Sequence, residues 1–317
     1  MRTMAPQLAL RPSPPDVLIH FHIPKTGGTS LSSMVKHGFR RDEIFESINQ
    51  GEEVYGGLSL VSFECCRELL FAHGLERQKR IRYYSGHLPV GVHALFEGTA
   101  KSAKYITVLR HPVERVVSLF HFNSQYNNAY ARDGRAITFE EYVESRRDIN
   151  LHDYQVRLLS GAPELDAAAP ASSSDEVIAS AAVEKRHLEQ AKRNIEEHFL
   201  AAAPVEQLAD LALILRIIYG WPMRRLFNEY KNRTKLRPRR KQIPPRLLRI
   251  IEDCNRHDIE LHEWVTERFV RQSLSFEPHL SRDRRVFGII NRALTATGQI
   301  LPPGPRKRMA ELLFYAR

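Results

Sequence analysis

The stretch that decides the fold is Ile19-His20-Phe21-His22-Ile23-Pro24-Lys25-Thr26-Gly27-Gly28-Thr29-Ser30. Its apolar beginning predicts a buried strand that includes Val17 and Leu18, and the residues from Leu31 to Val35 predict a helix. Between the two, a glycine pair lets backbone N–H groups approach an anion, and the positive end of the helix faces the same place. One lysine adds a point charge, and three hydroxyl residues add donors. We therefore predict that residues 24–30, called the phosphate loop below, bind phosphate.

The order of residues in this loop differs from that of a Walker A loop. In a Walker A loop the lysine follows the glycines, and the next hydroxyl residue holds Mg²⁺. Here Lys25 precedes Gly27 and Gly28, and no apolar strand ending in Asp stands out to complete a Mg²⁺ site. Hydrolysis of ATP or GTP is therefore disfavoured. A turn without a ligand is the plain alternative, but such turns seldom need a lysine and three hydroxyl residues together.

The charge of the chain is a second guide to its partners. The composition is that of a globular protein, with 43% hydrophobic and 26% charged residues among 317. This length allows a sizeable core. The formal net charge of +10 implies a positive field that attracts polyanions. Nucleotides, acidic glycans and nucleic acids all meet that description, so charge does not choose among them.

Three features predict a cytoplasmic location. Cys65, Cys66 and Cys254 are too few and wrongly spaced for a disulfide framework or a cysteine zinc site, which favours a reducing compartment. The N-terminal residues lack the continuous apolar segment of a signal peptide. The most apolar later stretch, Leu208 to Tyr219, is too short to span a bilayer and predicts a buried amphipathic helix.

A second strand-to-helix turn is predicted in the middle of the chain. Ile81–Ser85 predicts a short strand, and Lys104–Leu109 predicts a clearer one that is followed at once by Arg110. Pro112 suits a first helical turn, and apolar residues recur after it at helical spacing. Helices are also predicted at Asp175–Glu197, Val205–Ile218 and Pro245–Val270, a strand at His198–Ala202, and no pattern is readable in residues 40–68. Such alternation of strands and helices indicates an α/β fold with a parallel sheet.

The domain organisation is expected to be simple. Residues 16–275 predict one domain, preceded by a flexible, proline-punctuated lead in residues 1–15. Residues 160–174, rich in Ala, Pro and Ser, predict a flexible loop within it. Residues 276–317 carry no interpretable pattern and are treated as a C-terminal extension.

The two turns are expected to build one site. Ligands of a parallel sheet bind beyond the carboxyl ends of its strands, so Arg110 should lie near Lys25. Ser118 follows Arg110 by two helical turns, and a guanidinium beside a hydroxyl suits a phosphate on the far side of a nucleotide. Arg115, between them, is more typical of a solvated or salt-bridged helix residue.

These motifs resemble those of sulfotransferases. Pro24–Ser30 looks like their 5′-phosphosulfate loop, and Val108–Ser118 looks like their 3′-phosphate motif. The resemblance is closest to the heparan sulfate 2-O-sulfotransferase type and its bacterial relatives. It extends over residues 17–270, because Tyr84–Pro89 is similar to the family's Gly-His segment and the stretches Asn150–Gly161 and Ala191–Ile195 are also similar.

The resemblance implies a fold, a reaction and a set of site residues. The fold is a P-loop-like α/β structure with three layers and a central parallel sheet. The reaction transfers a sulfuryl group from 3′-phosphoadenosine 5′-phosphosulfate (PAPS) to a carbohydrate hydroxyl, releasing 3′-phosphoadenosine 5′-phosphate (PAP), without a metal. The implied roles are Lys25 at the leaving oxygen, Thr26, Gly27, Gly28, Thr29 and Ser30 at the 5′-phosphate, Arg110, Ser118, Arg237 and Lys241 at the 3′-phosphate, and His87 as general base.

The chain departs from this family at two positions, and other histidines compete for the role of base. His111 stands where many members have Asp, and Ser85 stands where the animal 2-O enzymes carry an additional histidine. A neutral histidine with a pKa near ~6.5 suits proton removal from an alcohol. His22 lies beside the phosphate loop and His73 is flanked by glycine, so both are rivals of His87.

Two other functions stay open on the sequence alone. A P-loop nucleotide kinase fits the loop, but the lysine position and the missing Mg²⁺ ligands oppose it. A nucleic-acid-binding protein fits the net charge and the basic run from Lys231 to Lys241. However, no nucleic-acid-binding signature is recognisable, so no nucleic acid is expected as partner. The expected acceptor is a glycan or glycolipid, with an acidic one favoured by the charge, and the sequence indicates no oligomeric state.

Overall fold

A parallel sheet forms the centre of the molecule. The computed structural model describes residues 12–47, 62–97, 99–126, 131–132, 135–162, 165, 182–226 and 240–300. Within them, the five-stranded sheet has the order β2-β3-β1-β4-β7, and each neighbouring pair is parallel. The strands are β1 (Val17–Phe21), β2 (Ile44–Glu46), β3 (Tyr83–Gly86), β4 (Ala103–Leu109) and β7 (Phe199–Pro204). A small antiparallel pair, β5 (Ala131–Arg132) and β6 (Arg135–Ala136), lies apart from this sheet.

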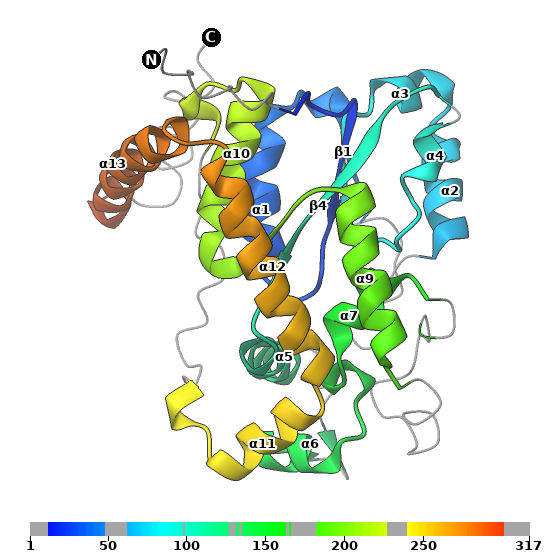
Figure 1. Ribbon diagram of the computed structural model, residues 1–317, viewed down its shortest axis with the longest axis vertical. Helices are drawn as coiled ribbons and strands as arrows, with labels where there is room; N and C mark the ends of the chain where they lie inside the picture. The colour runs from blue at the N-terminus through cyan, green and yellow to red at the C-terminus, as the bar shows by residue number, and fades with distance from the viewer. Residues whose placement is uncertain are drawn as a thin grey trace, which may run out of the picture.

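Helices cover both faces of the sheet. Side chains of a strand alternate between its faces, so Val17, Ile19 and Phe21 of β1 pack on one side while Leu18 packs on the other. The Leu18 side is covered by α1 (Gly28–Val35) and α10 (Leu208–Tyr219). The Ile19 side is covered by α2 (Phe63–Ala72), α4 (Ala94–Glu97) and α9 (Lys185–His198), with α3 (Leu75–Arg80) after α2 (Figure 1). The predicted three-layer α/β fold is confirmed.

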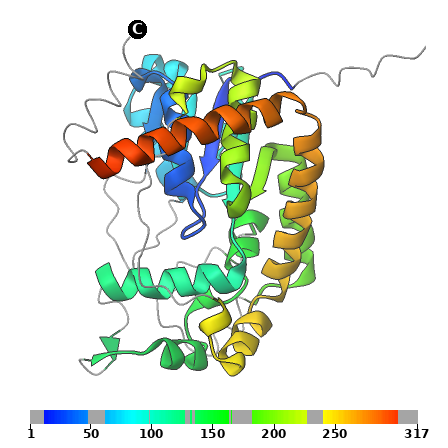
Figure 2. The same cartoon turned by 90° about the vertical axis from the view of Figure 1, so that its left-hand side faces the viewer.

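Further helices close the edge of the sheet beside β7. Helix α12 (Arg256–Leu274) packs against β7 and reaches both layers, because Val265 joins the core on one side and Phe269 the core on the other. Helix α13 (His279–Ile300) then crosses α10 (Figure 2). It buries Leu280, and its Asp283 forms an ion pair with Arg216 of α10. The segment after residue 275, which has no readable sequence pattern, therefore begins with a helix packed on the core.

A separate helical layer lies at the carboxyl end of the sheet. Helix α5 (Pro112–Tyr126) runs across that end, with α6 (Phe139–Ser145) and α11 (Pro245–Asp253) on its far side (Figures 1 and 2). These three helices share a third apolar core that includes Val116, Tyr142 and Ile251. Helix α7 (Tyr154–Ser160) connects this layer to α9. The strands β1, β3 and β4 therefore point their carboxyl ends at α5.

Short 3-10 segments complete the described structure. They are η1 (Lys36–Gly38), η2 (Arg41–Glu43), η3 (Ile149–Leu151), η5 (Val205–Gln207), η6 (Met223–Arg225) and η7 (Arg240–Gln242). No helix in the described ranges is both long and apolar enough to cross a membrane. The Leu208–Tyr219 helix is buried along most of its length, as predicted.

One predicted helix is wrong, and several predictions lie outside the described residues. The single helix expected over Pro245–Val270 is two helices, α11 and α12, separated at Cys254 and Asn255. The Asn255 side chain donates to the carbonyls of Leu151 (2.7 Å) and Ile251 (2.8 Å), which holds the break in place. The strands predicted near Ile81, Lys104 and His198 are confirmed. Most of the predicted loop at 160–174, the start of the helix predicted from Asp175, and residues 227–239 lie outside the described residues.

Candidate active site

The phosphate loop is a tight turn held by its own residues. Lys25 has φ 69° and Gly27 has φ 99°, so both adopt the left-handed region. The Thr26 hydroxyl donates to the Ile23 carbonyl at 2.8 Å, and the Gly27 carbonyl accepts from the Ser30 amide at 3.0 Å. Thr26 is fully buried, whereas Thr29 is exposed and Ser30 is half-buried. Of the three hydroxyls, Thr26 therefore shapes the loop, while those of Thr29 and Ser30 are accessible at the start of α1.

The two glycines are required by packing as well as by their backbone. A methyl group added at Gly28 would lie 2.0 Å from Cδ2 of His22, and one added at Gly27 would lie 2.9 Å from Cγ2 of Val205. Side-chain atoms that close cannot be accommodated without movement. The loop therefore packs directly on the His22 ring on one side and on Val205 on the other.

Lys25 extends from this loop toward α5. Its Nζ lies 3.5 Å from the centre of the Phe122 ring, a cation–π contact. Ser118 precedes Phe122 by one helical turn, so the two side chains share a face of α5. Ser118 is almost fully buried. Lys25 thus contacts α5 at Phe122, one helical turn after the buried Ser118.

Arg110 follows the carboxyl end of β4 and precedes α5, so it lies at the same edge of the sheet as the phosphate loop. Its guanidinium is 3.5 Å from the Lys25 carbonyl and 3.4 Å from the Glu114 carboxylate. Both distances are at the upper limit for hydrogen bonds, and the Glu114 contact is an ion pair made by two guanidinium nitrogens. The Arg110 backbone is held more firmly, because the Gln155 side-chain amide accepts from its N–H at 2.9 Å and donates to its carbonyl at 2.8 Å. The structure thus brings Arg110 next to Lys25, whereas Ser118 is buried on α5 one helical turn before Phe122.

His87 reaches the same edge because β3 pairs with β1. Phe21 of β1 is in register with Gly86 of β3, and the His22 amide donates to the Gly86 carbonyl at 3.0 Å. The His87 and His22 ring centres are 4.9 Å apart. His87 is half-buried, whereas His22 is 9% exposed. Of these two histidines, His87 has the greater access to solvent beside the phosphate loop.

His20 and His22 form a buried stack below the loop. Their ring centres are 5.3 Å apart, and His20 Nδ1 lies 3.0 Å from the Ser85 hydroxyl and 3.3 Å from the Tyr83 hydroxyl. Burial, with a smaller contribution from His87, lowers the pKa of His20 to about 3. Burial also lowers the pKa of His22 well below 6.5, and His87, His20 and Lys25 add to that effect. Both buried rings are therefore neutral near neutral pH.

The third histidine considered from the sequence lies elsewhere. His73 is exposed at the end of α2, and its ring centre is 5.4 Å from that of Phe45. It leads into α3, whose Arg77 donates to the Ile44 carbonyl at the start of β2. Because strands β1 to β4 are parallel, the start of β2 is at the opposite edge from the phosphate loop. The structure does not bring His73 to the candidate site.

The described end of the basic stretch approaches the Arg110 turn. Arg240 lies 3.3 Å from Nε2 of His111, the residue after Arg110, and donates to the Glu252 carboxylate at 2.7 Å. Burial, with contributions from Arg240 and His262, lowers the pKa of His111 to about 4. Lys241 is exposed beside Arg240 in η7, and Arg237 lies outside the described residues. Arg240, which sequence reasoning did not single out, is therefore the described basic side chain next to this turn.

Arg115 has a structural role. It is fully buried, donates to the Asn150 carbonyl, and places its guanidinium carbon 4.6 Å from the centre of the Tyr154 ring. The sequence analysis predicted that Arg115 is a solvated or salt-bridged helix residue and not a ligand contact. The side chain is instead buried, where it binds the backbone before α7.

Comparisons with known proteins bear on the whole site. Residues 14–157 match the family model of the sulfotransferase domain, and this segment contains the phosphate loop, His87 and Arg110. A comparison with curated proteins found no match. In the described ranges, no group of three or more His, Cys, Asp or Glu residues could hold a metal ion. The family match supports a sulfotransferase and sulfuryl transfer as the general reaction, and this family generally uses PAPS.

The packing of Gly28 on His22 gives a first prediction. Gly28→Ala should lower the free energy of unfolding by about 1–3 kcal/mol, because the new methyl overlaps the His22 ring. Gly288→Ala in α13 is the matched control, since a methyl there meets no atom within 4 Å. The control should be neutral or more stable by about 0.5–1 kcal/mol. Denaturant unfolding measures both, and adding His22→Ala should relieve part of the Gly28→Ala loss. Equal stability of the two glycine variants would contradict this packing.

The buried histidines give a second prediction, on pH. Burial lowers the pKa of His20 to about 3 in the folded chain, against the ordinary value of 6.5 for an exposed histidine. Below pH 6.5 the unfolded chain therefore binds a proton that the folded chain does not, and stability falls as the pH falls. The contribution is complete above that pH and changes by on the order of 1 kcal/mol per pH unit below it. Denaturant unfolding of His20→Gln between pH 7.5 and 4.5 should show a shallower decline than the unchanged protein. Parallel declines would contradict a neutral buried His20.

Proposed function

We propose that the protein is a PAPS-dependent sulfotransferase that transfers a sulfuryl group to a carbohydrate hydroxyl and releases PAP. The observation that carries this proposal is the shared location of Lys25, Arg110 and His87 at the carboxyl edge of the sheet. Each comes from a different strand end, β1, β4 and β3 respectively. The family match over residues 14–157 supports the same reaction class.

In this proposal the phosphate loop holds the 5′-phosphosulfate. Backbone N–H groups at the start of α1 and the hydroxyls of Thr29 and Ser30 donate to the phosphate oxygens. Gly27 and Gly28 let the backbone approach, and Thr26 keeps the turn closed through Ile23. Lys25 leaves the Phe122 ring and donates to the oxygen that bridges phosphorus and sulfur. An ammonium stabilises that oxygen most when the bond breaks, so this contact favours the transition state.

Arg110 and Ser118 recognise the 3′-phosphate. The contacts of the Arg110 guanidinium with Glu114 and the Lys25 carbonyl, at 3.4–3.5 Å, are longer than the roughly 2.7–2.9 Å typical of a charge-assisted bond to phosphate. Arg237 and Lys241 add positive charge from the late basic segment, and Arg240 supports the turn through His111. A phosphate site at Arg110, beside a second one at the phosphate loop, suits a nucleotide that carries phosphate at both the 3′ and 5′ positions.

The reaction itself needs a base on the acceptor side. His87, beside His22, accepts the proton of the acceptor hydroxyl as its oxygen bonds to sulfur. The bond from sulfur to the bridging oxygen breaks, and its electron pair stays on the 5′-phosphate near Lys25. The resemblance to the heparan sulfate 2-O-sulfotransferase type favours a glycan or glycolipid acceptor, and the net charge of +10 favours an acidic one.

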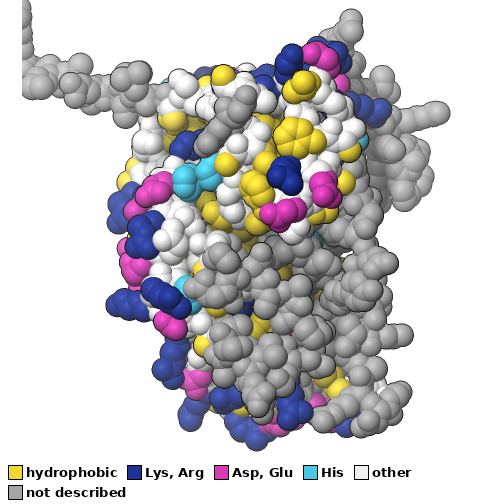
Figure 3. All heavy atoms as spheres, turned by 90° about the vertical axis from the view of Figure 1, so that its right-hand side faces the viewer, with side chains coloured by type: hydrophobic (Ala, Val, Ile, Leu, Met, Phe, Trp, Pro, Cys, Tyr) yellow, Lys and Arg dark blue, Asp and Glu magenta, His cyan; other side chains and the backbone are white. Residues whose placement is uncertain are grey.

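The two alternative functions have less support. A nucleotide kinase is opposed by the position of Lys25 before the glycines. A nucleic-acid-binding surface needs clustered basic side chains. On the face in Figure 3, the described Lys and Arg side chains are instead interspersed with Asp and Glu side chains.

A transfer assay with sulfur-labelled PAPS and a panel of acceptor glycans tests the proposal. Lys25→Ala should lower turnover by about 10²–10³-fold, as expected for loss of charge stabilisation at the leaving oxygen. His87→Ala should lower turnover by about 10²–10⁴-fold because the base is lost, while the affinity for PAP stays within about twofold. His73→Ala is the matched control, and its turnover should be unchanged.

Three outcomes would contradict the assigned roles. Normal turnover of Lys25→Ala would remove the lysine from catalysis. Loss of PAP affinity without loss of turnover per bound donor in His87→Ala would make His87 a donor-binding residue. If His22→Ala abolished turnover while His87→Ala retained it, the base would be His22.

A further inference from the structure

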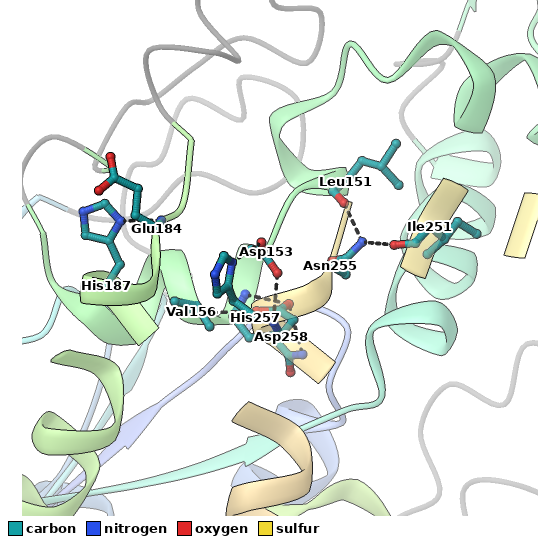
Figure 4. A network of polar contacts seen from close by, with 10 residues as sticks. Leu151, Asp153, Val156, Glu184, His187, Ile251, Asn255, His257 and Asp258 are labelled. Atoms are coloured by element: carbon teal, nitrogen blue, oxygen red, sulfur yellow. Dashed lines mark hydrogen bonds and ion pairs between the residues drawn. The ribbon is translucent and has the colours of Figure 1, made fainter. Parts of the chain in front are cut away.

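Two helices far apart in the sequence cap each other behind the candidate site. Asp258, buried near the start of α12, accepts from the backbone N–H groups of Gln155 (3.1 Å) and Val156 (2.8 Å) in the first turn of α7. Asp153, which precedes α7, accepts from the Asp258 backbone N–H at 2.8 Å and lies 3.0 Å from Nδ1 of His257 (Figure 4). Side-chain oxygens thereby satisfy N–H groups that helix starts leave open. The reciprocal caps fix α7 against α12.

The Gln155 side chain extends this cap to Arg110. Its Nε2 donates to the Asp258 carboxylate at 3.3 Å and to the Arg110 carbonyl at 2.8 Å, and its Oε1 accepts from the Arg110 N–H at 2.9 Å. Gln155 is fully buried. A carboxylate and a carbonyl can only accept, so Nε2 must face both of them and Oε1 must face the Arg110 N–H. Asp258 therefore reinforces the orientation of the amide that the Arg110 backbone requires.

The binding of the Arg110 backbone matters because the contacts of its side chain are long. The guanidinium forms an ion pair with Glu114 through two of its nitrogens at 3.4 Å and lies 3.5 Å from the Lys25 carbonyl, all beyond the usual hydrogen-bond length. Its direction therefore also depends on the backbone between β4 and α5, where one buried amide pairs both the N–H and the carbonyl of the residue. A rotation there would swing the guanidinium away from the phosphate loop.

We propose that Gln155, with its orientation reinforced by Asp258, positions Arg110 for the 3′-phosphate of the donor nucleotide. This inference rests on the proposed function, since it presumes that Arg110 binds that phosphate. Gln155 is a positioning residue that acts through the Arg110 backbone without touching the nucleotide. Its removal therefore weakens recognition of the 3′-phosphate and leaves the 5′-phosphate site intact.

Calorimetric titration of the full chain with PAP and with AMP, which lacks the 3′-phosphate, tests this role. Gln155→Met keeps the length and volume of the side chain but removes its hydrogen bonds. It should weaken PAP binding about tenfold, slightly less than complete loss of one hydrogen bond to a charged group would cost, and leave AMP binding within about twofold. Asp258→Asn keeps the Gln155 side chain but removes the carboxylate that accepts from its Nε2. It should weaken the binding of PAP and not of AMP, by a smaller factor than Gln155→Met does. Arg110→Ala should lose PAP affinity at least as strongly as Gln155→Met.

Asn194 provides the matched control. Its buried amide donates to the carbonyls of Leu159 (2.8 Å) and Ser160 (2.9 Å) at the other end of α7. Asn194→Ala removes two hydrogen bonds from the same helix, and neither of them involves Gln155 or Arg110. It should therefore lower the melting temperature and leave the ratio of PAP to AMP affinity unchanged. This ratio separates positioning from general destabilisation.

The possible failures are distinguishable. If Arg110→Ala weakens PAP selectively but neither Gln155→Met nor Asp258→Asn does, the positioning role is wrong and the proposed function stands. An equal loss of PAP and AMP affinity in Gln155→Met also overturns the positioning role. Unchanged PAP affinity in Arg110→Ala overturns the 3′-phosphate site, and with it the role of Gln155.

Discussion

The parallel pairing of β1 with β3 on one side and β4 on the other is the constraint on which the candidate site depends. Phe21 is in register with Gly86, and His20 is in register with Ile106. The Thr107 hydroxyl reinforces the second pairing by donating to the Phe21 carbonyl at 2.8 Å. Three strands thus end at one edge, and the residues that follow them are the phosphate loop, His87 and Arg110. A shift in either register would separate the lysine from the histidine or from the arginine.

The histidines below the loop connect this sheet geometry to the loop's shape. The His22 ring packs on Gly28 of the phosphate loop, and the His20 ring stacks on the His22 ring. His20 in turn lies near Tyr83, whose hydroxyl donates to Ser32 of α1 at 3.2 Å. Because burial keeps both rings neutral, the layer adds no positive charge that would compete with Lys25. The half-buried His87 is therefore the histidine of this group best placed to exchange a proton with an acceptor.

Local patterns in the sequence were sufficient to predict four of the five strands of the described parallel sheet and the two turns, but not the contacts behind them. The strand before Lys25 and the Pro112 helix are visible as apolar runs and spacing. Strand β2 is only Ile44–Glu46 and gives no periodic signal. The break at Asn255 depends on the Leu151 carbonyl, which comes from a distant part of the chain. The Gln155 contacts with Arg110 and Asp258 are likewise absent from any local pattern, since they exist only once α7 and α12 are packed.

Residue type alone also left the roles of some polar side chains open. Thr26 matched the expected phosphate donors, but its hydroxyl donates within the loop. Arg115 matched a surface helix residue, but it is fully buried, because α5 lies inside a layer formed with α6 and α11. In both cases the role of the side chain depends on a backbone carbonyl that the fold places within hydrogen-bonding distance of it, that of Ile23 for Thr26 and that of Asn150 for Arg115. The sequence gives no helical pattern for α13, because its buried apolar residues, such as Leu280 and Phe287, are few and lie among several arginines.

The most direct measurement of the central claim is a calorimetric comparison of PAP with ATP–Mg²⁺ on the unmodified protein. A site with separate 5′- and 3′-phosphate positions and a lysine ahead of its glycines should bind PAP at least about tenfold more tightly than ATP–Mg²⁺. Binding of PAP should also persist in the presence of a metal chelator. Tighter binding of ATP–Mg²⁺ than of PAP would contradict the account and favour a phosphotransferase.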